Sequence, residues 1–179
     1  MTTAFDRASL AHVSGTPHAG NAASSVISPA DFAAAIDEIM QWDGYAATPL
    51  VNLRHLAAHL SLEQVLYKDE GPRFGLGSFK ALGGSYAALR VLQRQISGAV
   101  GHAVSLADIR AGKYADEAAK ITLISATDGN HGRAVAWGCQ RFGAPCRIYI
   151  HADVSEGRAV AMRDLGAEVI RIAGDYDAS

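Results

Sequence analysis

The sequence predicts an α/β fold with a parallel sheet, and three features of its last third carry that prediction. Short apolar segments with the length of buried strands span 121–126, 146–150 and 168–172. Helical segments with one apolar face span 133–142 and 154–165, and a glycine follows each of them. Strands joined by helices of this length form right-handed crossovers, which place the strands parallel in one sheet.

The composition is that of an ordinary globular protein, with 179 residues, 49% hydrophobic and 19% charged, and a formal net charge of −2. The lack of any run of lysine or arginine argues against nucleic-acid binding. No apolar stretch approaches the roughly 20 residues of a membrane span. The N-terminus lacks the charged start and apolar core of a signal peptide, so we expect a cytoplasmic protein.

The cysteines and two of the histidines are candidates for metal or redox groups. Cys139 and Cys146 fit neither a redox motif nor a zinc knuckle, and we expect both to be reduced core residues. His55 and His59 share one face of a predicted helix at i, i+4 spacing. That spacing can begin a metal site, but no third ligand is evident. We interpret the pair as part of a solvated face and predict no metal.

Ahead of the sheet, the chain is predicted to begin with an arm and a helix. Residues 1–28 are rich in Ala, Ser, Thr and Gly without periodicity, which predicts a mobile arm. A helix opens at Pro29, has one apolar face, and ends near Gly44. Residues 45–50 are interpreted as a turn-like link into a second helix, and 64–68 as a buried strand.

The segment 67–86, YKDEGPRFGLGSFKALGGSY, carries the first candidate site. Its glycines predict a loop, and Ser78 is a good N-cap for a helix that spans 79–96. Lys80 then lies in the first turn, where the helix dipole disfavours a cation and favours the neutral amine. A neutral amine can attack an aldehyde. The simpler alternative is a solvated surface lysine.

We expect three charged residues of the loop before Lys80 to have structural roles. Arg73 could contact an anion, but we expect an exposed loop arginine. Asp69 and Glu70 are interpreted as charges at the entry of the loop. Residues 97–120 are polar and irregular, and Ser105 is predicted to cap a short helix there.

A second candidate site, TDGNHG at 127–132, follows the first predicted strand of the sheet and opens a helix. Ligands of such sheets bind at the carboxyl ends of the strands, where this turn lies. Gly129 and Gly132 let the backbone approach a ligand, and a helix N-terminus offers free N–H donors. Their spacing is not that of a dinucleotide fingerprint or a P-loop. A tight turn capped by Asp128 explains the same residues without a ligand.

GLGSFKALGG and DGNHG together resemble the cofactor-lysine segment and the asparagine loop of pyridoxal-phosphate (PLP) enzymes of fold type II. That family includes serine/threonine dehydratases, threonine synthase and cysteine synthase. The resemblance implies PLP as the cofactor, with Lys80 holding it covalently and Asn130 bonding its ring hydroxyl. Phe79, next to the lysine, could pack beside the cofactor, although the core face of its helix suits Phe79 equally well. The loop residues implied to hold the carboxylate of a small amino-acid substrate are Thr127, Gly129 and His131.

The longer string KDEGPRFGLGSFKALGG and the residue Asp128 look most like the diaminopropionate ammonia-lyases. The resemblance implies that Lys80 and Asp128 are two catalytic acid–base groups. The implied reaction is α,β-elimination of 2,3-diaminopropionate, as the D or L isomer, to pyruvate and two ammonia, by a homodimer. Two alternatives stay open. One is a serine/threonine dehydratase, in which Ser is expected at the place of Asp128; the other is an inactive copy that at most binds a partner or a small anion.

The resemblance begins near Thr48 and implies a parallel three-layer α/β sheet of the fold type II kind, incomplete in this chain. In the family, the glycine-rich loop for the PLP phosphate and the residue that faces the pyridine nitrogen follow the segments matched here. We therefore expect an N-terminal fragment in three parts. These are an arm at 1–28, the start of the large PLP domain with the cofactor lysine at 29–96, and a small α/β domain at 97–179.

Overall fold

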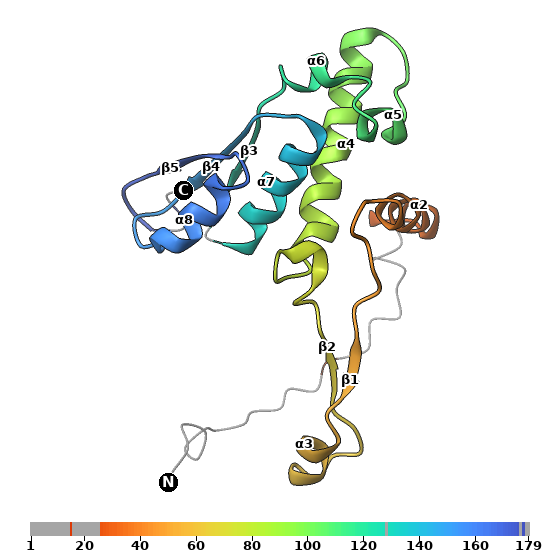
Figure 1. Ribbon diagram of the computed structural model, residues 1–179, viewed down its shortest axis with the longest axis vertical. Helices are drawn as coiled ribbons and strands as arrows, with labels where there is room; N and C mark the ends of the chain where they lie inside the picture. Colours follow the sequence, from red (N-terminus) through yellow and green to blue (C-terminus); the bar gives the residue numbers. More distant parts are fainter. Residues whose placement is uncertain (1–14, 16–25, 128, 176, 178–179) are drawn as a thin grey trace. The chain divides into compact units, whose positions relative to one another are not determined.

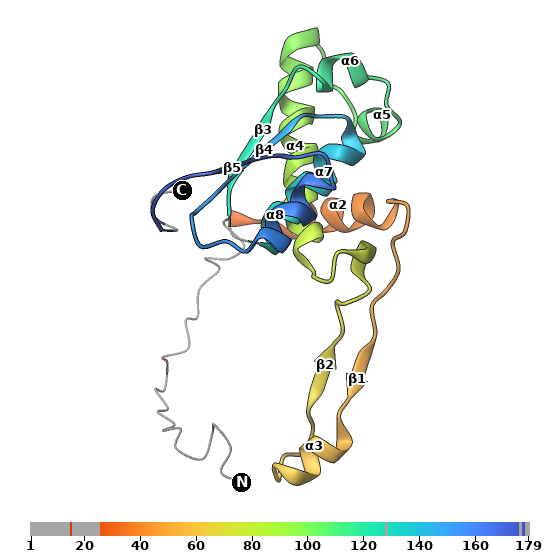
Figure 2. The same cartoon turned by 60° about the vertical axis from the view of Figure 1, so that its left-hand side comes forward.

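The predicted parallel sheet is present in the computed structural model, which describes residues 15, 26–127, 129–175 and 177 (Figure 1). Strands β3 (Leu123–Ala126), β4 (Cys146–Ile150) and β5 (Glu168–Arg171) lie in the order β3-β4-β5, and both neighbouring pairs are parallel. Figure 2 shows the three strands side by side. Most of the predicted arm at 1–28, and Asp128, lie outside the described residues.

Two helices connect these strands and pack against them. α7 (Asn130–Phe142) begins three residues before the predicted start, and α8 (Glu156–Arg163) is shorter than predicted at both ends. A glycine in the left-handed conformation follows each helix, Gly143 at φ +76° and Gly166 at φ +82°. α7 contacts β3 and β4, whereas α8 contacts β5 and α7. The alternation of strands and helices predicted from the sequence is therefore confirmed.

α4 (Lys80–Val100) lies along α7, and the two helices run in the same direction (Figure 1). Small residues make this contact, so the two backbones come close. Ser85 Oγ donates a 2.7 Å hydrogen bond to the carbonyl of Ala134. A Cβ added to Gly138 would lie only 2.8 Å from the Cα of Ser85. Because the helices are parallel, their first turns, which carry the two candidate sites, lie at the same end of the contact.

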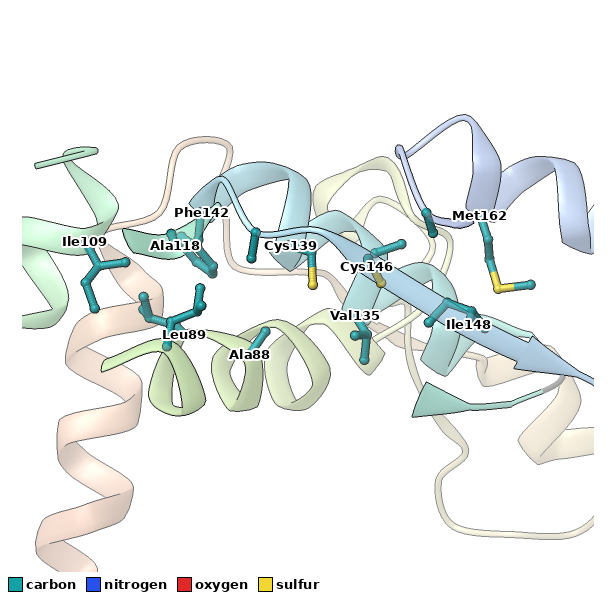
Figure 3. Packing of buried hydrophobic residues seen from close by; sticks show 14 of the residues in the cluster. Ala88, Leu89, Ile109, Ala118, Val135, Cys139, Phe142, Cys146, Ile148 and Met162 are labelled. Carbon is teal, nitrogen blue, oxygen red and sulfur yellow. The ribbon is translucent and has the colours of Figure 1, made fainter. Parts of the chain in front are cut away.

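Apolar side chains of α4, α7 and the sheet form one buried cluster. Leu89, Leu92 and Ile96 of α4 are fully buried in it, and Figure 3 shows Leu89 together with both cysteines. Cys139 and Cys146 are free, buried thiols, which confirms the expectation of reduced core residues. The neighbouring thiol of Cys146, together with burial, raises the pKa of the Cys139 thiol.

Three further helices are α2 (Pro29–Met40), α5 (Leu106–Arg110) and α6 (Ala115–Ala118). α2 begins at the predicted proline. The predicted cap of α5 is also confirmed, since the Oγ of Ser105 accepts a 3.1 Å hydrogen bond from the backbone N–H of Asp108.

The segment between α2 and α4 differs from the prediction. β1 (Leu50–Asn52) and β2 (Leu66–Lys68) form an antiparallel pair with α3 (Arg54–His59) between them; we call residues 50–68 the hairpin. The link predicted as turn-like therefore ends in a strand. The strand predicted as buried is exposed at all three residues, because among the described residues it belongs to a sheet of only two strands.

A buried ion pair next to the hairpin corrects a second prediction. Arg73 is only 7% exposed, and its Nε lies 2.8 Å from a carboxylate oxygen of Glu70. The guanidinium also donates to the carbonyl of Ala46 at 2.8 Å and to the hydroxyl of Thr48 at 3.0 Å. The turn at Gly71-Pro72 folds the two charges together, so Arg73 is not an exposed arginine and Glu70 is not a simple loop-entry charge. The hydrogen bond from Arg73 lowers the pKa of Glu70 to about 2, against the opposing effect of burial.

Two findings concern the chain as a whole. No helix among the described residues is long and apolar enough to cross a membrane. Contacts divide the chain into a unit of residues 1–34 and a unit of residues 35–179. The domain boundary predicted at residue 97 stays a prediction.

Candidate active site

One pocket of about 440 Å³ brings the two candidate sites together. Lys80 enters it from the first turn of α4, and Asn130 enters it from the first turn of α7. The arrangement follows from the parallel contact of the two helices, which places both N-terminal turns at one end. The residues that line the pocket are Lys80, Ala126, Thr127, Gly129, Asn130, His131 and Arg158. Phe79, expected beside the cofactor, is not among them.

Lys80 is the first helical residue of α4, one residue later than the predicted helix start. The N-cap residue is Phe79, so the N-cap predicted at Ser78 is wrong by one position, although the Oγ of Ser78 accepts a 3.2 Å hydrogen bond from the backbone N–H of Lys80. Gly77, at φ +71°, makes the preceding bend in a conformation that favours glycine. Phe79 is 57% exposed, so its interpretation as a core residue is wrong. Its ring centroid lies 5.4 Å from the Nζ of Lys80, at the distance of a cation–π contact.

Two contacts hold the lysine loop, residues 69–79, against α7. The ring of Phe74 stacks on that of Trp137 with centroids 4.8 Å apart. Farther along the loop, Nη1 of Arg133 donates a 3.0 Å hydrogen bond to the carbonyl of Leu76. The helix that carries Asn130 therefore also positions the loop that leads to Lys80.

Thr127 anchors the asparagine loop to the sheet. Its backbone N–H donates a 3.0 Å hydrogen bond to the carbonyl of Tyr149 on β4, and its side chain is buried. Gly132 then brings α7 close to this turn, since an added Cβ would lie 2.6 Å from the Cγ2 of Thr127 and 2.5 Å from the Sδ of Met162. A larger residue here would force the side chains of Thr127 and Met162 to shift, so the second glycine of the motif has a packing role.

The side chains of Asn130 and His131 are exposed at the pocket. Asn130 is the first helical residue of α7, and Gly129 is its N-cap residue. Asp128, the predicted second acid–base group, lies outside the described residues, so its role stays a prediction. Within the described part of the chain, no group of three or more His, Cys, Asp or Glu side chains is placed to hold a metal ion.

Arg158 is a pocket residue that the sequence analysis did not single out. It lies in the first turn of α8, the helix that follows β4. In a parallel sheet the carboxyl end of every strand faces the same side, so the turn after β4 adjoins the turn after β3. The sequence does contain a signal for Arg158, because a cationic residue stands in the first turn of a helix that follows a strand of the sheet.

The chemistry of the lining residues fits PLP. A primary amine can bond an aldehyde carbon, and a side-chain amide can donate to a ring hydroxyl. The guanidinium of Arg158 suits an oxyanion, either a phosphate or a carboxylate. The pocket volume lies within the usual range for small-molecule sites, about 300–1,000 Å³.

Comparisons with known proteins agree with this geometry. The sequence model of the family described as "Pyridoxal-phosphate dependent enzyme" matches residues 41–179. Diaminopropionate ammonia-lyase of Salmonella typhimurium is 38% identical over 133 residues, which cover 74% of this chain and 33% of that protein. The Escherichia coli (strain K12) enzyme of the same name is 38% identical over 134 residues, covering 75% and 32%. The chain thus spans about a third of the length of these relatives.

Solved structures give the same result. Diaminopropionate ammonia-lyase from Escherichia coli, in complex with an aminoacrylate-PLP azomethine reaction intermediate, matches with a TM-score of 0.70 at 33% identity, over 84% of this chain and 36% of that chain. A PLP-dependent aspartate racemase matches with a TM-score of 0.61 at 24% identity, over 80% and 37%, which shows the fold alone. The resemblance drawn from the two motifs, the fold class and the cofactor class are confirmed. The chain belongs to the pyridoxal-phosphate dependent enzyme family.

Proposed function

We propose that this chain carries the cofactor lysine of an enzyme that eliminates ammonia from 2,3-diaminopropionate with PLP. The observation that carries the proposal is the shared pocket, in which an amine from α4 and an amide from α7 line one cavity of about 440 Å³. The substrate is suggested by the two relatives of 38% identity, which are diaminopropionate ammonia-lyases. Since the chain spans a third of their length, the complete activity belongs to this proposal.

Lys80 and Asn130 would hold the cofactor. The amine of Lys80 would bond the aldehyde carbon of PLP, and the amide of Asn130 would donate to its ring hydroxyl. Phe79, next to Lys80 in the sequence, would pack beside the cofactor ring. When bound, PLP supplies an electron sink that stabilises negative charge at Cα of an amino acid.

The remaining roles belong to proton transfer and substrate binding. The Nζ of Lys80, once freed by the substrate's amine, would take the Cα proton, and the carboxylate of Asp128 would act as the second acid–base group. The substrate carboxylate would be held at the N-terminus of α7 by Thr127, Gly129 and His131. The expected products are pyruvate and two molecules of ammonia. We further expect a homodimer in the cytoplasm.

Trapping of the cofactor tests the lysine assignment without any assay of activity. The protein is incubated with PLP and reduced with borohydride, and its peptides are mapped by mass spectrometry. We expect a pyridoxyl group on the peptide that contains Lys80. Lys80→Ala should abolish that adduct, whereas Lys113→Ala, at an exposed lysine that pairs with Asp108, should leave it unchanged. An adduct that persists in Lys80→Ala, or one spread over surface lysines, would refute the assignment.

The substrate is tested separately, by measuring ammonia release from 2,3-diaminopropionate and from serine under the same conditions. We expect the diamino acid to be the better substrate. Faster release of ammonia from serine would instead favour the alternative hypothesis of a serine/threonine dehydratase.

A further inference from the structure

We propose that Arg158 binds an oxyanion in this pocket, either the carboxylate of the amino-acid substrate or the phosphate of PLP. The identity of the anion rests on the proposed function, but the binding of an oxyanion does not. No role for Arg158 is implied by the lysine segment or by the asparagine loop, and it comes from a third element, α8.

The position of the guanidinium supports the proposal. The Cδ and Nε atoms of Arg158 lie 3.9 Å, and its Cζ 4.0 Å, from the place of a Cβ on Gly129. The end of the side chain therefore lies against the residue that precedes α7. The guanidinium thus lies near the N-terminus of α7, where the first N–H groups lack intrahelical partners.

The described cations and donors around the pocket suit an anion. Among the described residues that line it, Lys80 and Arg158 are cationic and none is acidic; Asp128, the proposed second acid–base group, lies outside the described residues. The cations come from different helices, α4 and α8, so they are not one solvated run of charge. A guanidinium has five N–H donors in a planar fork that matches a carboxylate or a phosphate. It can keep one protein partner and still hold an oxyanion with two other donors.

An NMR titration without PLP tests the proposal. The protein is titrated with inorganic phosphate and with acetate, and amide shifts are followed. We expect saturable shifts in the segments 127–132 and 156–160. Arg158→Met should weaken binding by at least about tenfold, the loss expected for one charge-assisted contact. Arg158→Lys should keep part of the affinity, because it keeps the charge and loses the fork.

Arg163→Met is the matched control, since Arg163 lies on the same helix, ion pairs with Glu156 and does not line the pocket. This variant should bind both anions as the natural protein does. Equal anion affinity in Arg158→Met and the natural protein, or shifts that map away from the pocket, would overturn the proposal. Thermal unfolding of each variant confirms that the fold is retained.

Two further arms identify the anion. If Arg158→Met weakens binding of PLP and not of pyridoxal, the anion is the phosphate. If it weakens binding of 2,3-diaminopropionate and not of its amide, the anion is the substrate carboxylate. An anion titration that depends on Arg158, together with no pyridoxyl adduct at Lys80, would reject the proposed function and leave this inference standing.

Discussion

The lysine loop is held at its two ends by different kinds of contact, small-residue packing at one end and an ion pair at the other. Where it leads into α4, the helix packs on α7 through uncharged small residues, and an added Cβ on Gly138 would lie 2.8 Å from the backbone of Ser85. Where it leaves the hairpin, it is held by the buried pair of Arg73 and Glu70, together with the hydroxyl of Thr48. The first contact depends on shape, and the second depends on ionisation.

This difference indicates which perturbations should act on each end. A change of charge or pH should loosen the start of the loop and leave the α4–α7 contact in place, because Ser85, Ala134 and Gly138 carry no titratable group. A change of side-chain volume should do the reverse. Lys80 follows the loop and is the first residue of α4, so its position depends on both the ion pair and the α4–α7 contact.

The largest effect is expected from Arg73→Met. This substitution leaves the carboxylate of Glu70 in a site where its side chain is only 16% exposed, without its cationic partner. Breaking a buried pair in this way costs about 3–5 kcal/mol. Urea unfolding should show that loss in the free energy of unfolding, and amide hydrogen exchange should rise first at residues 46–48 and 70–73.

Arg54→Met, at an exposed arginine in α3, is the control and should change stability by less than about 0.5 kcal/mol. If the amides of α4 and α7 lose protection as early as those around Arg73, the two ends of the loop are not independent and the comparison fails.

Acid should act on the same end, with a somewhat smaller effect. The pKa of Glu70 is lowered from 4.5 to about 2, chiefly by its hydrogen bond with Arg73. A depressed pKa means that the unfolded chain binds the proton more readily, so this contribution to stability is complete above about pH 5 and is lost as the pH falls towards 2. The loss is at most about 3 kcal/mol.

The measurement is the free energy of unfolding between pH 5 and pH 2, for the natural protein and for Glu70→Gln. The variant should be less stable at pH 7 and should show a flatter dependence on pH across that window. Parallel curves for the two proteins would show that Glu70 does not titrate as the structure indicates.

The sequence predicted the C-terminal part of the fold because local patterns decide it. Strand β4 matches its predicted bounds, 146–150, and the parallel order follows from the alternation of strands and helices. Lys80 was placed in the first turn of a helix, and Asn130 in the glycine turn that precedes the next helix, for equally local reasons. That both line one pocket depends on the close contact of α4 with α7, which no local pattern reveals.

Arg73 was assigned wrongly as an exposed arginine, and Arg158 was not identified because its role depends on other segments. Arg73 and Glu70 are opposite charges three residues apart across a Gly-Pro turn, which was a usable signal. The hydrogen bonds of Thr48 with this pair could not be predicted from the sequence, because Thr48 lies 22 residues before Glu70. For the hairpin, an apolar run predicted burial, but burial requires a covering element that the described residues do not provide.

The smallest effect, and the sharpest test of the other end, comes from Gly138→Ala compared with Gly83→Ala. A methyl group at residue 138 would meet the Cα of Ser85 at 2.8 Å, and backbone cannot move aside as a flexible side chain can. We expect a loss of about 2 kcal/mol by urea unfolding, since overpacking outweighs the better helix propensity of alanine. At residue 83, on α4, nothing lies within 4 Å of an added Cβ, so alanine should stabilise by roughly 0.5–1 kcal/mol.

Opposite signs for the same substitution would establish that the α4–α7 contact is limited by shape. The loss of stability in Gly138→Ala should then be the same at pH 7 and pH 4. A loss in Gly138→Ala that grows as the pH falls would link this contact to the ion pair of Arg73 and remove the distinction between the two ends of the loop.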